Sequence, residues 1–214
     1  MFVLAIALVA WTVAASSMGK PQTIDRAIIL AVVGLIFLVL FVIINQRGRG
    51  QLFDLSIFRQ PTVACGGFAY FALQFINIGI SVVIPVYAQE ALGLSTVISG
   101  VILLPGSLVG GAFAPIGGHW ADRTHYRYPV LTGALLLFLS TLGFSLGQRW
   151  LDAWSLVIWY MVLRVGFNLA FANTLANTTT LVEPTKTADV NSIFNMLQQF
   201  AGSLGVSILA ALIA

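Results

Sequence analysis

Charged residues are scarce in this chain. Asp, Glu, Lys and Arg make up only 8% of its 214 residues, whereas 59% are hydrophobic. An ordinary soluble domain carries about a quarter charged residues. So few charges cannot coat a soluble globule of this size, but a lipid bilayer needs none along its hydrocarbon core. The composition therefore indicates a membrane protein.

Cysteine, metal-ligand patterns and catalytic motifs are also lacking. The single cysteine, Cys65, lies inside an apolar run without a second cysteine, so we interpret it as a small packing residue. His119 and His125 are not spaced with cysteine or carboxylates as metal ligands, and we expect neither a metal nor a cofactor. Because the chain also lacks a nucleophile placed with a base, a phosphate loop and a dinucleotide fingerprint, we do not expect an enzyme.

The ten Lys and Arg residues give a net charge of +3. They are scattered singly between apolar runs rather than gathered into a stripe, so we expect no nucleic-acid partner.

Long apolar stretches dominate what the sequence does contain. A helix needs about 20 mostly apolar residues to cross about 30 Å of hydrocarbon. Seven candidate spans run from about residue 2 to 17, 27 to 45, 62 to 88, 96 to 118, 128 to 147, 153 to 181 and 191 to the end. We therefore predict an all-α, polytopic membrane protein with about seven transmembrane helices, in contact with the lipid bilayer.

Basic residues are distributed unequally between the predicted loops. One set of alternate loops carries Arg47, Arg49, Arg59, Arg123, Arg127 and Lys186, and the other carries Lys20, Arg26 and Arg149. Since short loops rich in Lys and Arg are retained on the cytoplasmic side of the membrane, the first set of loops and the amino terminus are predicted to be cytoplasmic. Residues 52–59 mix apolar and charged side chains, which suits either a short helix in the inner interface or a plain linker.

The fourth predicted span has a face of small residues. Gly106, Gly110, Ala114 and Gly118 follow one another at four-residue intervals. Helices in lipid associate closely where small residues let their backbones approach, so we predict a helix-packing face here. A moving interface of a transporter is the alternative interpretation.

The third predicted span has a polar face. Tyr70, Gln74, Asn77 and Ser81 stand at offsets of four, three and four, and therefore share one side of the helix. Because amides are costly toward lipid, these side chains face either the bundle interior or a water-filled cavity. They are candidate residues of a substrate pathway.

Arg164 is the only charge well inside a predicted span. It lies about 15 Å below Trp154, close to the middle of the bilayer, and Asn168 follows one turn later on the same face. An ionised group at this depth needs a cavity, a carbonyl or an anionic partner. Arg164 and Asn168 are thus further candidates for the substrate pathway, and a structural arginine is the alternative.

The loop predicted after the fourth span contains Gly118, Asp122, Arg123 and Arg127. Such a charged cluster can latch neighbouring helix ends in one conformation and release them in another. A simply solvated loop is the alternative interpretation.

This loop resembles the signature of the major facilitator superfamily, in which Gly, Asp, Arg and a further basic residue recur with this spacing. Trp120 and His125 depart from it, standing where the family usually has Leu and Gly. Residues 52–59, 100–106, 163–166 and 198–207 are similar to segments of the fourteen-helix drug/proton antiporters of the EmrB/QacA type. The resemblance covers nearly the whole chain.

The resemblance implies an incomplete carboxy-terminal half of a major facilitator fold. Residues 1–50 would form two linker helices, 51–61 a cytoplasmic interfacial segment and 62–214 five helices of the bundle. It further implies export of small hydrophobic or cationic drugs in exchange for protons, from the cell membrane, and an inactive chain because the amino-terminal half is missing. A metabolite transporter of the same fold and a membrane structural or remnant protein are the alternatives.

Overall fold

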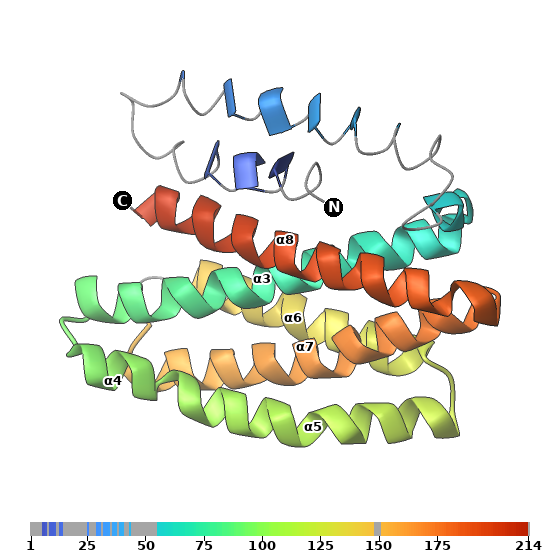
Figure 1. Cartoon of the computed structure of the whole chain (residues 1–214). Coiled ribbons are helices and arrows are strands. Elements are labelled where there is room, and N and C mark those ends of the chain that lie inside the picture. The colour runs from blue at the N-terminus through green and yellow to red at the C-terminus, as the bar shows by residue number, and fades with distance from the viewer. Residues whose placement is uncertain are drawn as a thin grey trace.

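The structure, a computed structural model, describes residues 55–147 and 151–213, together with individual positions between residues 6 and 43. The regular elements of the continuous parts are all helices. In chain order they are η2 (Leu55–Arg59), α3 (Pro61–Glu90), α4 (Thr96–Val101), α5 (Leu103–Arg123), α6 (Arg127–Leu146), α7 (Ala153–Thr180), η3 (Pro184–Lys186) and α8 (Thr187–Ile213). The long helices lie side by side in one bundle (Figure 1). The all-α prediction is confirmed.

Four helical stretches of the described residues are long and apolar enough to cross a membrane. They are Pro61–Glu90, Thr96–Arg123, Arg127–Leu146 and Ala153–Thr180, matching the third to sixth predicted spans. The seventh predicted span corresponds to α8, which begins four residues earlier than expected, at Thr187. Its first turn is polar, so the apolar pattern does not mark it. The first two predicted spans lie largely outside the described residues.

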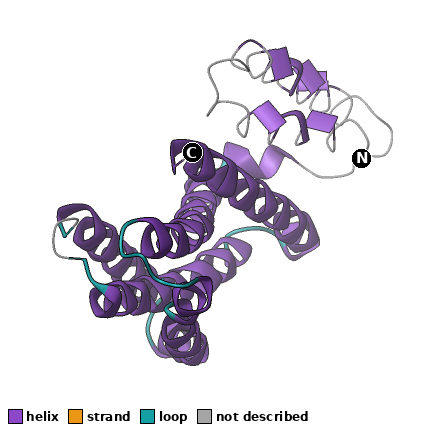
Figure 2. Cartoon of the chain, turned by 90° about the vertical axis from the view of Figure 1, so that its left-hand side faces the viewer, coloured by secondary structure: helices purple, strands orange, loops and turns teal. Residues whose placement is uncertain are grey.

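Helix α7 is the centre of the bundle. It packs along α5, α6 and α3, and α3 packs in turn on α8; the end-on view of Figure 2 shows this grouping. One core cluster joins α3, α6 and α7 through residues that include Leu73, Leu137 and Leu163. A second joins η2, α3 and α8 through residues that include Ile57, Tyr70 and Phe194. Short η2 is therefore packed on the bundle.

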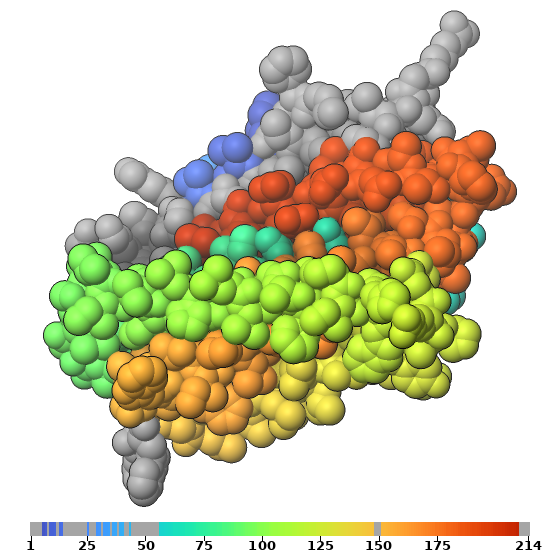
Figure 3. Space-filling view, turned by 90° about the horizontal axis from the view of Figure 1, so that it is seen from below, coloured from blue at the N-terminus to red at the C-terminus, as the bar shows by residue number. Residues whose placement is uncertain are grey.

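The outside of the bundle is apolar. Leu108 on α5 is 74% exposed and Leu146 on α6 is 76% exposed, and many further large aliphatic and aromatic side chains point outward. Figure 3 shows the face on which α5 lies beside α7 and α6. A soluble protein does not expose so much contiguous apolar surface, whereas lipid requires it.

The fourth predicted span is not one continuous helix. It breaks at Ile102 into α4 and α5, three residues before Pro105. Proline has no amide hydrogen, and its ring collides with the carbonyl of the residue four positions earlier, here Val101. The break in the helix therefore falls one turn ahead of the proline itself.

The predicted loop of residues 118–127 is largely helical, which corrects the sequence-based expectation. Helix α5 continues through Gly118, Asp122 and Arg123, and Arg127 already begins α6. Only residues 124–126 connect the two helices. Continuing the helix keeps the backbone hydrogen bonds of these polar residues paired, which the charged pattern alone does not indicate.

Candidate functional site

Arg164 lies inside the bundle and links α7 to α3. It stands about 16 Å along α7 from the first residue of that helix. Its Nη1 donates a hydrogen bond of 2.7 Å to Oδ1 of Asn77 on α3. The guanidinium carbon also lies 5.6 Å from the centre of the Phe167 ring. The only charge in the middle of a predicted span is thus turned toward the protein and away from lipid.

The polar face of α3 points at α7 and α8. Gln74 and Asn77 are buried, and the Ser81 hydroxyl lies 3.1 Å from the hydroxyl of Tyr160 on α7. The Tyr70 hydroxyl donates a 3.2 Å hydrogen bond to Oε1 of Gln198 on α8. The structure therefore places these four candidates with Arg164 along one seam where α3 meets α7 and α8, called the polar seam below.

Helix α5 packs against α7 beside Arg164. A glycine of α5, Gly110, stands at this contact, so no side chain of α5 separates the two helices there. A Cβ added to Gly110 would lie 2.8 Å from Arg164 Cβ and 2.8 Å from Asn168 Nδ2. Asn168 turns its amide back onto its own helix and donates a 2.8 Å hydrogen bond to the Arg164 carbonyl oxygen. Asn168 therefore packs beside Arg164 without bonding its guanidinium.

The small face of α5 follows the helical repeat rather than a strict four-residue interval. Its buried positions are Gly106, Gly110, Gly117 and Ala121. Each step of four residues turns the face by about 40°, so three steps carry Gly118 about 120° away from Gly106. Ala114 is half-buried, and nothing lies within 4 Å of a Cβ added to Gly118. The predicted face thus holds at Gly106 and Gly110 and drifts off the contact by Gly118.

Two buried polar atoms of the seam have no partner in the described structure. They are Oε1 of Gln74 and Nε of Arg164. Gln74 is only 6% exposed and precedes Asn77 by one helical turn on the same face. Buried polar atoms are normally hydrogen-bonded, so the seam holds one donor and one acceptor whose hydrogen bonds are unfilled.

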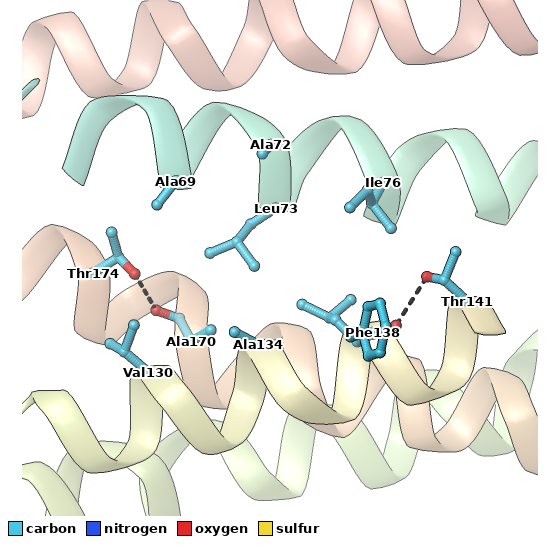
Figure 4. Close-up of a pocket in the computed structure, with 11 residues that line it drawn as sticks. Ala69, Ala72, Leu73, Ile76, Val130, Ala134, Phe138, Thr141, Ala170 and Thr174 are labelled. Carbon is cyan, nitrogen blue, oxygen red and sulfur yellow. Dashed lines mark hydrogen bonds between the residues drawn. The ribbon is translucent and has the colours of Figure 1, made fainter. Parts of the chain in front are cut away.

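An apolar groove lies on another side of α3. It has a volume of about 330 Å³ and is lined from α3, α6 and α7 by residues such as Ala72, Ala134 and Ala170. Figure 4 shows these side chains with two hydroxyls, of Thr141 and Thr174, bonded back to their own helices. Its lining does not include Arg164. We place the chemistry at the polar seam because the groove offers almost no free polar group.

The start of α7 is fixed by a capping box. The Asp152 carboxylate accepts a 2.9 Å hydrogen bond from the backbone N–H of Ser155, whose hydroxyl lies 2.8 Å from the Asp152 amide nitrogen. Hydrogen bonding to the carboxylate by the backbone N–H and then the side chain of Ser155 lowers the pKa of Asp152 below its ordinary value. The cap fixes where α7 begins, eleven residues before Arg164.

The charged residues at the end of α5 and the start of α6 lie on the surface. Asp122, Arg123 and Arg127 are exposed. Their role as a conformational latch stays a prediction. Among the described residues, no three His, Cys, Asp or Glu side chains gather as metal ligands.

Sequence reasoning missed two members of the seam. Tyr160 precedes Arg164 by one helical turn and therefore shares its face, a signal that was present in the spacing. Gln198 on α8 also belongs to the seam through Tyr70. Its contact joins residues 128 positions apart, which no local pattern reveals.

Known proteins resemble this chain along almost its full length. It is 25% identical to the lincomycin resistance protein LmrB of Listeria monocytogenes over 90% of the chain and 41% of that relative. It is 30% identical to the putative multidrug resistance protein MdtD of Escherichia coli, over 91% of the chain and 41% of the relative. It is 29% identical to the tetracenomycin C resistance and export protein of Streptomyces glaucescens, over 81% of the chain and 32% of the relative.

The chain spans about two fifths of the length of the first of these relatives. The family described as Major Facilitator Superfamily matches residues 1–206. Together with the apolar helices that are long enough to cross a membrane, this match decides the class of protein. The chain is a multi-pass membrane protein that belongs to the Major Facilitator Superfamily.

Proposed function

We propose that this chain is part of a secondary transporter that exports amphipathic or cationic small molecules in exchange for protons. The names of three relatives refer to drug resistance or export, which supports efflux rather than uptake. The resemblance to the fourteen-helix antiporters supports the proton as the coupling ion and the cell membrane as the location. An amino terminus on the cytoplasmic side follows from the distribution of basic residues.

The observation that carries the proposal is the hydrogen bond between Arg164 and Asn77 in the bundle interior. An ionisable side chain this far inside a membrane span is by default a candidate for binding a substrate or moving an ion. The bond also connects the two helices, α3 and α7, that present the polar seam. A substrate that bound there would change the contact between these helices.

We further propose that the transporter needs a second part, an amino-terminal half, for activity. The matched relatives are more than twice as long as this chain. All seven acidic residues stand at positions 25, 54, 90, 122, 152, 183 and 189, none of them near the middle of α3, α5, α6 or α7. A carboxylate that carries protons through the membrane interior would therefore come from outside this chain.

Export in a drug-sensitive host tests the proposal. The complete transporter that contains this segment is expressed as wild type, as Arg164→Ala and as the control Arg59→Ala, which removes an exposed arginine at the end of η2. Efflux of preloaded chloramphenicol, an uncharged amide, is followed, and membrane abundance is measured by immunoblot. We expect Arg164→Ala to abolish export at unchanged abundance and Arg59→Ala to retain it. Export that survives Arg164→Ala would contradict the assignment.

A further inference from the structure

The charge at the centre of the seam is positive, and no carboxylate of the described residues pairs with it. The spans around Arg164 contain no acidic residue at comparable depth, because the nearest acids in sequence, Asp152 and Glu183, flank the two ends of α7. The partner that the structure gives the guanidinium is the neutral amide of Asn77. A cationic group placed here would meet uncompensated like charge.

The guanidinium also has bonding capacity left over. It carries five N–H donors in a planar fork. One nitrogen, Nη1, is bonded to Asn77, while Nε is buried without an acceptor. An oxygen atom, neutral or anionic, is the chemical group that a free guanidinium N–H binds best.

Gln74 supplies an unpaired hydrogen-bond acceptor. Its Oε1 is an acceptor without a donor, on a side chain that is 6% exposed. Gln74 and Arg164 both adjoin Asn77, the first along α3 and the second through its hydrogen bond. A free donor and a free acceptor thus flank one amide, and a purely apolar molecule would satisfy neither.

We infer that Arg164, Asn77 and Gln74 form a subsite for the oxygen-bearing head group of an amphipathic substrate, a carboxylate or a carboxamide, and that this subsite disfavours cations. A carboxylate oxygen binds the free Arg164 N–H. A carboxamide does the same through its carbonyl and donates its own N–H to Gln74. The inference rests on the proposed export function, within which it selects the charge of the substrate.

Three matched probes test this selectivity on the purified 214-residue chain in detergent micelles. They are 1-pyrenebutanoate, 1-pyrenebutanamide and 1-pyrenebutyltrimethylammonium, which share one apolar body and differ in the head group. Binding is followed by energy transfer from the tryptophans of the chain to pyrene. The wild type should bind the carboxylate and the carboxamide about 10- to 100-fold tighter than the ammonium probe, as expected for one charge-assisted hydrogen bond.

Two variants at the Arg164 bond make the result specific. Arg164→Ala should reduce the binding of both oxygen-bearing probes to that of the ammonium probe. Asn77→Asp replaces the amide that contacts Arg164 by a carboxylate and keeps the arginine. It should therefore weaken the binding of 1-pyrenebutanoate and strengthen the binding of the ammonium probe. Monodispersity and helix content by circular dichroism show that each variant is folded.

Gln74→Leu separates the two head groups. It removes the acceptor that the carboxamide needs and leaves the carboxylate contact intact, so only 1-pyrenebutanamide should bind more weakly. The control Arg59→Ala removes an exposed positive charge elsewhere and should leave all three affinities unchanged.

Equal wild-type affinities for the three probes would overturn the inference. So would a preference that survives both Arg164→Ala and Asn77→Asp, and so would the absence of any binding, because water alone would then serve the two unpaired atoms. These outcomes are independent of export. Efflux without head-group selectivity contradicts only the subsite, and selectivity without efflux in the complete transporter contradicts only the proposed transport.

Discussion

Gly133 on α6 and Gly166 on α7 bring the backbones of their helices into direct contact. A Cβ added to Gly166 would lie 2.7 Å from the carbonyl oxygen of Gly133, and one added to Gly133 would lie 2.7 Å from the backbone nitrogen of Ala170. Backbone atoms cannot rotate aside as the end of a side chain can. This pair therefore fixes how closely α6 approaches the helix that carries Arg164.

Gly133→Ala should destabilise the bundle by about 1 to 3 kcal/mol, because the added methyl group overpacks a backbone contact. Gly118→Ala is the matched control, since nothing lies within 4 Å of its added Cβ. The same methyl group there should stabilise the helix by up to about 1 kcal/mol. The temperature at which half of the monodisperse protein is lost in detergent compares the two variants. Equal midpoints would refute the close backbone contact between α6 and α7.

Tyr160→Phe should cost about 0.5 to 1.5 kcal/mol of stability, because it removes the hydroxyl that lies 3.1 Å from Ser81 in the seam. Tyr160 is only 3% exposed, whereas Tyr128 is 53% exposed. Tyr128→Phe is therefore the control and should change nothing. Unfolding by titration with a denaturing detergent compares the variants, and an equal effect of both would argue against the α3 to α7 contact.

The stability of the first turn of α7 should decrease at acid pH, because Asp152 becomes protonated. Hydrogen bonds from Ser155 lower the pKa of this carboxyl below its ordinary 3.8. A lowered pKa means stabilisation that is full above the ordinary pKa and is lost as the pH falls through the lower, folded value. The protection factors of the amide hydrogens at residues 153–157, which are corrected for the intrinsic pH dependence of exchange, should therefore be constant from neutral pH to about pH 5 and should fall at the most acid pH.

Asp152→Asn is the control for this pH dependence. The asparagine keeps a side-chain oxygen that caps the helix but does not titrate in this range. Its protection at residues 153–157 should not respond to acid. An identical response of wild type and Asp152→Asn would show that another group governs the first turn.

Much of the bundle follows from periodicity. The spans ending at Glu90, Leu146 and Thr180 lie within two residues of their predicted ends, because charge and turn residues bound them in the sequence. The helical continuation through Asp122 was not predictable in the same way. Polar residues at a helix end look the same as polar residues of a loop, and the difference lies in backbone hydrogen bonds.

The residues of the seam are predictable from spacing, but their pairing is not. Tyr70, Gln74, Asn77 and Ser81 share a face by the helical repeat alone. The partner of each depends on how α3 lies against α7 and α8, which is decided by close contacts such as those of Gly66 with Thr178 on α7 and of Gly205 on α8 with the Phe75 carbonyl oxygen. The unpaired atoms of Gln74 and Arg164 follow from that three-dimensional fit and leave no trace in a linear pattern.

The central claim is that these helices cross the bilayer repeatedly, with the connection between α5 and α6 in the cytoplasm. In a Cys65→Ser background, which leaves no other cysteine, Thr124→Cys and Ala91→Cys place single exposed thiols at opposite ends of the spans. A membrane-impermeant maleimide applied to intact cells should label Ala91→Cys and should reach Thr124→Cys only after the membrane is permeabilised. Labelling of Thr124→Cys in intact cells would contradict the account.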